Sequence, residues 1–258
     1  MREPKKTGFK KLLLFVAGMV TAFTLLSGVT PVERDNVERD NNEGIVTADT
    51  TVTTAAVDSI NRLYDDLNLD SFQLSKEAYT FAVKGYKNLI AQGAISKQDL
   101  LSIVDFSLPS SQKRLFILDM HMGKLLFNTY VSHGKNSGIE QATKFSNDLN
   151  SFQSSLGFYV TGKSYKGEHG FSLRLEGLEK GINDNAFDRG IVIHSARYVN
   201  EKMAKKLGYI GRSLGCPAIP VNLHRAIIQK IKDGSCLFLY GPDTSYTAKS
   251  VMMNGFRV

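Results

Sequence analysis

A cysteine and an upstream histidine are the residues of this sequence whose types and spacing suggest catalysis. Cys216 lies between a glycine and a proline in the stretch 211–220, and His194 ends an apolar run 22 residues earlier. The glycine leaves backbone room beside the thiol, and the proline restricts the chain after it. Because a nearby imidazole can take the proton of a thiol, such a pair can generate a nucleophilic thiolate. The pattern therefore predicts an enzyme that attacks an amide bond.

The second cysteine, Cys236, defines the main alternative for Cys216. Two cysteines could form one disulfide in an oxidising compartment, which would remove the nucleophile. Cys236 lies in the apolar run 235–240, however, which is typical of a buried strand. A cysteine in such a run usually packs as a small hydrophobic residue. We therefore favour two free thiols over a disulfide.

The sequence around Cys216 and His194 resembles the L,D-transpeptidase family, whose members are also called YkuD-like. Residues 213–216 read Ser-Leu-Gly-Cys where the broad family has Ser/Thr-His-Gly-Cys, so Leu214 replaces a second histidine. Ala218 stands where that family has an asparagine. Over about 110–245, including Tyr-x-Gly-x-His-Gly at 165–170, the chain is similar to the branch described as murein L,D-transpeptidase catalytic domain.

The resemblance implies a mainly β catalytic domain that acts on peptidoglycan stem peptides. Cys216 would attack the carbonyl of the third stem residue, release D-Ala and leave a thioester for an amine or water. His194 would act as general base and then general acid, with the backbone carbonyl of Ser195 orienting its ring. The backbone N–H groups of Leu214, Gly215 and Cys216 would form the oxyanion hole. The remaining candidates for contact with the substrate are Ser213, His169 and Arg212. Arg212 could hold a carboxylate in a bidentate manner.

Two alternatives remain open beside the transferase. An L,D-carboxypeptidase would hydrolyse the same thioester, and the sequence does not distinguish the two acceptors. A non-catalytic cell-wall-binding module would keep the fold without turnover, but the presence of both Cys216 and His194 favours an enzyme. We expect neither metal nor cofactor, because the chain lacks tight ligand spacing such as His-x-x-x-His and lacks a phosphate loop. His121 and His133 are expected in surface turns.

The first 28 residues have the layout of a secretory signal. Residues 1–11 are basic, 12–26 are apolar and uncharged, and small residues follow. This predicts export to the periplasm or cell envelope, with an uncleaved membrane anchor through 12–26 as the alternative. The segment carries +4 of the formal net charge of +7. The rest of the chain is therefore too weakly basic to suggest a nucleic-acid binder.

The hydrophobic pattern of the remaining chain predicts a polar linker, a helical segment and a strand-rich domain. Residues 29–57 are polar, and apolar residues recur at helical spacing within 58–106, where Ser96 and Asp99 resemble a capping box. Short apolar runs between turn residues then predict a mainly β catalytic domain over 107–245, with short helices at 200–207 and 221–231. Residues 246–258 are expected to form a C-terminal tail, and the protein is expected to be a monomer. The predicted strands are 114–119, 124–131, 157–162, 171–175, 190–194 and 236–240.

Overall fold

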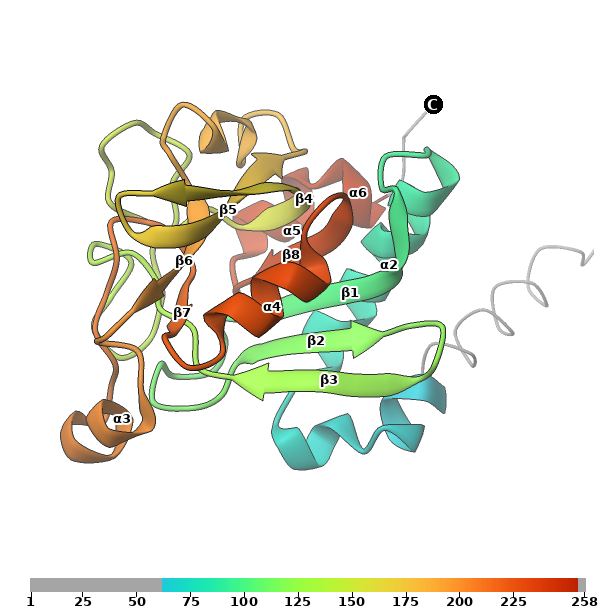
Figure 1. The fold of residues 1–258 in the computed structure, drawn as a ribbon. Coiled ribbons are helices and arrows are strands. Elements are labelled where there is room, and N and C mark those ends of the chain that lie inside the picture. The colour runs from blue at the N-terminus through green and yellow to red at the C-terminus, as the bar shows by residue number, and fades with distance from the viewer. Residues whose placement is uncertain (1–61, 255–258) are drawn as a thin grey trace, which may run out of the picture. The chain divides into compact units, whose positions relative to one another are not determined.

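An eight-stranded sheet dominates the part of the chain that the computed structural model describes, residues 62–254 (Figure 1). The strand order is β3-β2-β1-β8-β4-β5-β6-β7. The strands are β1 (Lys97–Asp105), β2 (Leu115–Asp119), β3 (Lys124–Thr129), β4 (Gly157–Gly167), β5 (Gly170–Gly177), β6 (Val192–Ala196), β7 (Ala218–Pro220) and β8 (Ser235–Tyr240). The predicted mainly β fold with a few short helices is thus confirmed. The expected export signal or membrane anchor and the polar linker lie outside the described residues.

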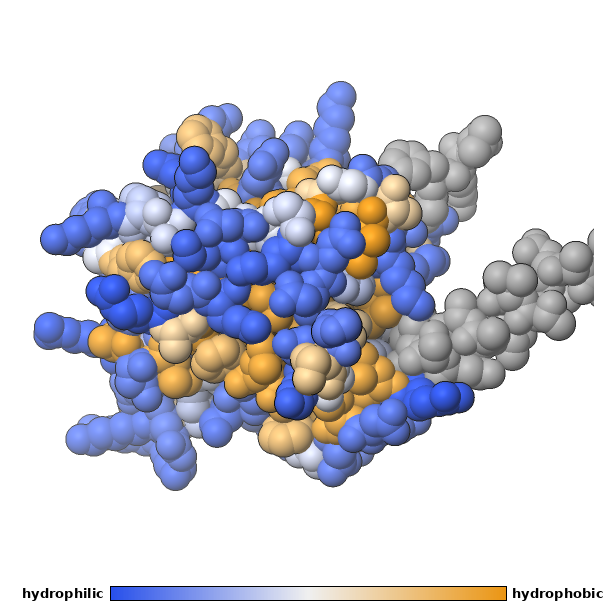
Figure 2. All heavy atoms as spheres, turned by 45° about the vertical axis from the view of Figure 1, so that its right-hand side comes forward, coloured by the Kyte–Doolittle hydropathy of each residue, from blue (hydrophilic) through white to orange (hydrophobic). Residues whose placement is uncertain are grey.

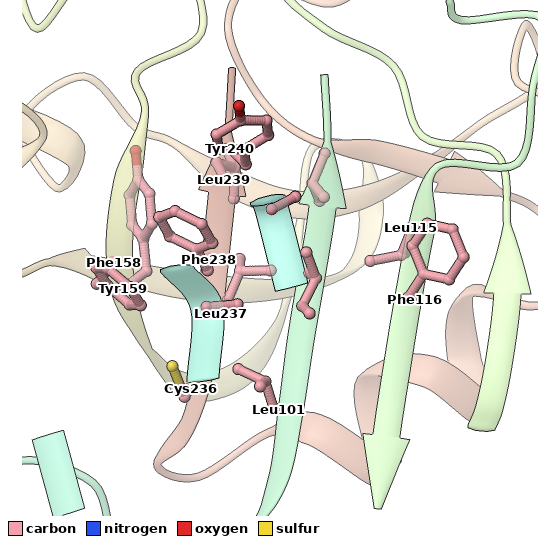
Figure 3. Close-up of a cluster of buried hydrophobic side chains, with 14 of the residues drawn as sticks. Leu101, Leu115, Phe116, Phe158, Tyr159, Cys236, Leu237, Phe238, Leu239 and Tyr240 are labelled. Atoms are coloured by element: carbon pink, nitrogen blue, oxygen red, sulfur yellow. The ribbon is translucent and has the colours of Figure 1, made fainter. Parts of the chain in front are cut away.

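Strand β8 is the central strand of this sheet. It pairs in parallel with β1 and antiparallel with β4, and all its residues are buried. Figure 3 shows its side chains packed among those of the neighbouring strands, with the Phe158 and Phe238 rings stacked at 4.2 Å between centroids. Cys236 belongs to this core, and both it and Cys216 are free thiols. The disulfide alternative is therefore absent from the structure.

Helices cover the sheet and complete the core. They are η1 (Leu69–Phe72), α2 (Lys76–Ala91), η2 (Asp184–Ala186), α3 (Glu201–Leu207), α4 (His224–Ile231), α5 (Thr244–Lys249) and α6 (Val251–Asn254). Helix α2 begins at Ser75, whose side chain accepts a hydrogen bond from the Ala78 N–H. It packs against β1 and β8, whereas α4 packs against β4, β5 and β6. A Cβ atom at Gly85 of α2 would overlap the Phe158 ring, so this helix position requires glycine.

The helical prediction for 58–106 is wrong beyond Ala91. Residues Lys97–Asp105 form β1, so Ser96 and Asp99 are not a capping box. A short apolar run is compatible with either a buried helix or a buried strand, because both faces of a central strand are covered. Pairing with β8, more than 130 residues later in the chain, decides the matter here.

The segment 246–254 is part of the fold, contrary to the expected tail. Tyr246, Met252 and Met253 are buried in the core. The hydroxyls of Tyr246 and Ser250 donate hydrogen bonds to the buried carboxylate of Glu179, which fastens α5 and α6 to the loop after β5. The sequence of this segment gives no helix signal, because its few apolar residues do not recur at helical spacing.

The surface of the described residues is mainly polar. Figure 2 shows hydrophilic side chains over much of one face, with apolar groups between them. Among residues 62–254, no helix combines the length and apolar character that a membrane crossing requires.

Candidate active site

The pairing of β6 with β7 brings Cys216 beside the strand that carries His194. These strands run in parallel with His194 opposite Ala218, and Cys216 lies two residues before β7. The Cys216 thiol accepts a hydrogen bond from the Val192 N–H at 3.5 Å and donates one to the Gly190 carbonyl at 3.6 Å. The sulfur therefore lies against the first residue of β6 and against Gly190, two residues before that strand, close in sequence to His194.

The imidazole of His194 is held in one orientation by its own strand. Its Nδ1 lies 3.0 Å from the carbonyl oxygen of Ser195, and since that oxygen can only accept, Nδ1 carries the proton. Nε2 is then the nitrogen that is free to accept a proton. His194 is only 5% exposed, and the ring of His169 stacks on it at 4.4 Å between centroids. His169 itself is exposed in the β4–β5 turn, so the structure brings His194, Ser195 and His169 together.

Ser213 organises the cysteine loop, residues 211–217. Its hydroxyl donates to the Cys216 carbonyl at 2.6 Å and accepts from the Gly215 N–H at 3.1 Å. Of the three N–H groups expected in an oxyanion hole, that of Gly215 therefore already has an acceptor. The N–H groups of Leu214 and Cys216 have no backbone or side-chain oxygen acceptor within residues 62–254.

Gly215 is required by the shape of this loop. Its φ is +128°, in the left-handed half of the Ramachandran plot, and a Cβ would lie 2.9 Å from the Gln153 carbonyl oxygen and 3.0 Å from Ile191. The glycine of the predicted motif thus permits the close approach of segment 146–155 to the cysteine loop.

Arg212 and Leu214 both have exposed side chains. The Arg212 guanidinium is exposed and donates to the carbonyls of Lys135 and Gly138, at 3.3 and 3.2 Å. Leu214 is 59% exposed. The geometry therefore gives no support to the expectation that Arg212 binds a carboxylate beside Cys216.

His133 is a buried support of the cysteine loop, not the surface residue expected from sequence. Its carbonyl accepts hydrogen bonds from the Ser213 N–H and hydroxyl, and its Nδ1 accepts one from the fully buried Arg114 at 2.7 Å. Burial, with repulsion from the Arg114 cation, lowers the pKa of His133 to about 4. This neutral histidine is a structural residue that the sequence reasoning missed.

Burial keeps both members of the cysteine–histidine pair neutral. It raises the pKa of the Cys216 thiol, against the opposing effects of the Val192 N–H and the Arg189 cation. It lowers the pKa of His194, and the neighbouring His169 adds to that effect while the hydrogen bond to Ser195 opposes it. At neutral pH the free site therefore holds a thiol and an imidazole rather than a thiolate and an imidazolium.

Arg189 is the second residue that sequence reasoning missed. It precedes β6, and its guanidinium donates to four oxygens of segment 146–155. A Cβ at Gly215 would lie 3.3 Å from its Nη2, so the guanidinium lies beside the cysteine loop. Nothing in the pattern Asp188-Arg189-Gly190 distinguishes it from an ordinary turn arginine. No group of three or more His, Cys, Asp or Glu within residues 62–254 is arranged to hold a metal ion.

Comparison with known proteins extends the sequence resemblance to most of the described residues. A family model described as L,D-transpeptidase catalytic domain matches residues 70–240, which also include α2 and β1. Among solved structures, an L,D-transpeptidase from Mycobacterium smegmatis is 14% identical with a TM-score of 0.35, over 55% of this chain and 59% of that one. The helical cell shape determining protein Pgp2 from Campylobacter jejuni is 19% identical with a TM-score of 0.33, over 57% of this chain and 49% of that one.

These solved structures differ in extent from the present chain, which spans between half and six-tenths of their length. No curated protein sequence matches it. The family model covers well over half of the chain, including the cysteine loop, β6 and the β4–β5 hairpin. The chain belongs to the family of L,D-transpeptidase catalytic domains.

Proposed function

We propose that this chain is an exported cysteine peptidyltransferase acting on peptidoglycan stem peptides. It would cleave the bond between the third stem residue and a terminal D-Ala and transfer the acyl group to an amine. The observation that carries this proposal is the position of the Cys216 sulfur on the backbone of β6, the strand that carries His194, whose Nδ1 is held by the Ser195 carbonyl. The family assignment supports the substrate class, and the N-terminal pattern supports export.

In the first step, Nε2 of His194 takes the thiol proton as the Cys216 sulfur attacks the third-residue carbonyl. A C–S bond forms, and the carbonyl oxygen becomes an oxyanion, to which the N–H groups of Leu214 and Cys216 would donate, since neither has an oxygen acceptor within residues 62–254. One such donor is typically worth ~100-fold or more in rate. The C–N bond then breaks, and the imidazolium returns its proton to the departing D-Ala amine.

In the second step, an acceptor amine attacks the thioester while His194 takes a proton from it. The C–S bond breaks, and the sulfur recovers the proton, which restores the neutral pair. Water in place of the amine would give the carboxypeptidase reaction by the same route. Since both groups are neutral in the free site, the thiolate forms as substrate is attacked and is not stored beforehand.

The test is incubation of the protein with tetrapeptide stems, followed by mass spectrometry. A cross-linked dimer identifies a transferase, and a tripeptide without dimer identifies a carboxypeptidase. Cys216→Ala should abolish D-Ala release and the acyl-enzyme mass, whereas Cys236→Ala, which removes a buried thiol outside the site, serves as the matched control. D-Ala release that survives Cys216→Ala would remove the mechanism, and a wild-type protein that binds stems without any turnover would identify the non-catalytic module.

A further inference from the structure

We propose that Arg189 is a positioning residue for Cys216: it fastens segment 146–155 behind the cysteine loop and supplies the positive charge that stabilises the thiolate as it forms. The consequence for turnover rests on the proposed function. The positions of the Arg189 donors and the effect of its charge do not rest on the proposed function, because they concern only the reactivity of the Cys216 thiol.

The structural half of this proposal rests on four hydrogen bonds from one guanidinium. Nη1 donates to the Ser146 carbonyl at 2.7 Å and to the Ser155 hydroxyl at 3.1 Å. Nη2 donates to the Ser151 hydroxyl at 3.2 Å and to the Gln153 carbonyl at 2.5 Å. The segment forms no helix or strand, and a planar donor with five N–H groups can join four of its oxygens at fixed positions.

Segment 146–155 in turn contacts the cysteine loop directly. The Ser154 hydroxyl donates to the Gly215 carbonyl at 3.2 Å and accepts from the Gly134 N–H at 3.1 Å. The Gln153 carbonyl that accepts from Arg189 is also the atom that a Cβ at Gly215 would meet. Arg189 is thus linked to the cysteine loop through segment 146–155, which contacts both.

The electrostatic half rests on the absence of a carboxylate partner. All four acceptors of Arg189 are neutral oxygens, and no Asp or Glu within residues 62–254 forms a salt bridge with it. Its charge is therefore not cancelled locally and can act on a nearby thiolate. The other titratable groups that act on it are Tyr159, which is buried, and Asp148, an exposed carboxylate on the same segment.

The remaining groups around the sulfur do not supply this charge. His194 is held neutral by burial, and Tyr198 is an uncharged phenol at neutral pH. Arg212 is exposed, and its guanidinium donates to the carbonyls of Lys135 and Gly138. Arg189 is thus the one charged group that opposes the effect of burial on the pKa of the Cys216 thiol, beside the backbone N–H groups of Val192 and of Cys216 itself.

The test compares Arg189→Gln, which removes the charge, with Arg189→Lys, which keeps the charge and loses the fork of donors. Both are made in a Cys236→Ala background, so that one thiol remains, and alkylation by neutral iodoacetamide is followed across pH. We expect Arg189→Gln to raise the alkylation midpoint by about one pH unit and to slow the reaction about tenfold at pH 7. Arg189→Lys should stay within about threefold of the parent. Arg197→Gln, a change at an exposed arginine after β6, is the charge control.

A second reagent reports the charge independently. Iodoacetate carries a negative charge, so the parent should prefer it over iodoacetamide by more than a free thiol does, and Arg189→Lys should retain this preference. Arg189→Gln should lose it. A parent without the preference, an Arg189→Gln profile equal to that of the parent, or equal shifts for Gln and Lys would each overturn the proposal. If the Gln variant does not fold, the preference of the parent and of the Lys variant for iodoacetate still tests the proposal. Because no stem peptide is used, failure here is separate from failure of the proposed transferase activity.

Discussion

The two halves of the candidate site are built by different means. The histidine side is regular: β4, β5 and β6 are adjacent antiparallel strands, and His194 is oriented by the carbonyl of its own neighbour. The cysteine side is irregular: the cysteine loop is held by backbone contacts of Ser213 with segment 132–138 and by the Ser154 hydroxyl on the Gly215 carbonyl, and Arg189 in turn holds the segment that contains Ser154. Substitutions on the histidine side should therefore affect chemistry with little loss of stability, whereas those on the cysteine side should affect both.

The largest effect is expected on the histidine side. His194→Gln keeps a polar side chain of similar size but removes the general base, so D-Ala release from a tetrapeptide stem should fall by roughly 1,000-fold or more. The melting temperature should change little, because only one hydrogen bond to Ser195 is affected. Activity within tenfold of the wild type would show that another group takes the thiol proton.

The next largest effect is a loss of unfolding free energy in acid, caused by His133, which supports the cysteine loop. The pKa of His133 is lowered to about 4 in the folded protein, from an ordinary value near 6.5. Between these values the unfolded chain binds a proton that the folded chain does not, so acid favours unfolding. The shift corresponds to about 3 kcal/mol of unfolding free energy, lost as pH falls from 6.5 to 4.

Denaturant titrations across this range would measure that loss. His133→Gln should be less stable at neutral pH but should show a shallower dependence on pH, since its amide does not titrate. If the unfolding free energy of the variant and of the wild type fell equally steeply with pH, other groups would cause the acid sensitivity. The buried His194 is one such group, because its pKa is also lowered in the folded protein.

Gly215→Ala tests the close approach of the cysteine loop to segment 146–155. Gly181 is a matched control, because it also has a positive φ but has open space where a Cβ would lie. Gly181→Ala should cost about 1 kcal/mol from backbone strain alone, and Gly215→Ala about 2–3 kcal/mol because of the added overlap with Gln153. Equal losses in chemical denaturation would mean that the loop and the segment are less tightly joined than their contacts indicate.

The smallest effect is expected from Ser213→Ala. The change removes the bonds to the Cys216 carbonyl and from the Gly215 N–H, at a cost of about 1–2 kcal/mol. It also loosens the peptide unit of the nucleophile, so activity should fall about tenfold, and Ser213→Thr should recover part of it. If activity were unchanged while stability fell, Ser213 would support the loop without positioning Cys216.

The same contrast explains which parts of the protein could be predicted. Most strands, α3 and α4 followed from local patterns, since alternating or apolar runs depend on neighbours in sequence. Cys216 and His194 were proposed as catalytic from residue type and short spacing. The helical prediction fails at Lys97–Asp105, because the pairing of β1 with the distant strand β8 has no local sequence signal. His133 is expected at the surface but is buried against Arg114, 19 residues earlier in the chain, a contact that no local pattern indicates. Arg189 has no local signal either, because its partners are backbone carbonyls and serine hydroxyls, which every sequence contains.

The sequence by itself determined the family, the residues proposed as nucleophile and base, and the glycine beside the thiol, because these depend on residue type and short spacing. Only the tertiary structure decided that the pair is neutral, that the Gly215 N–H is already occupied, and that a guanidinium without a carboxylate lies behind the loop. Protonation and hydrogen bonding depend on burial and on which distant groups fold together. Those are properties of the assembled sheet rather than of any one segment of the chain.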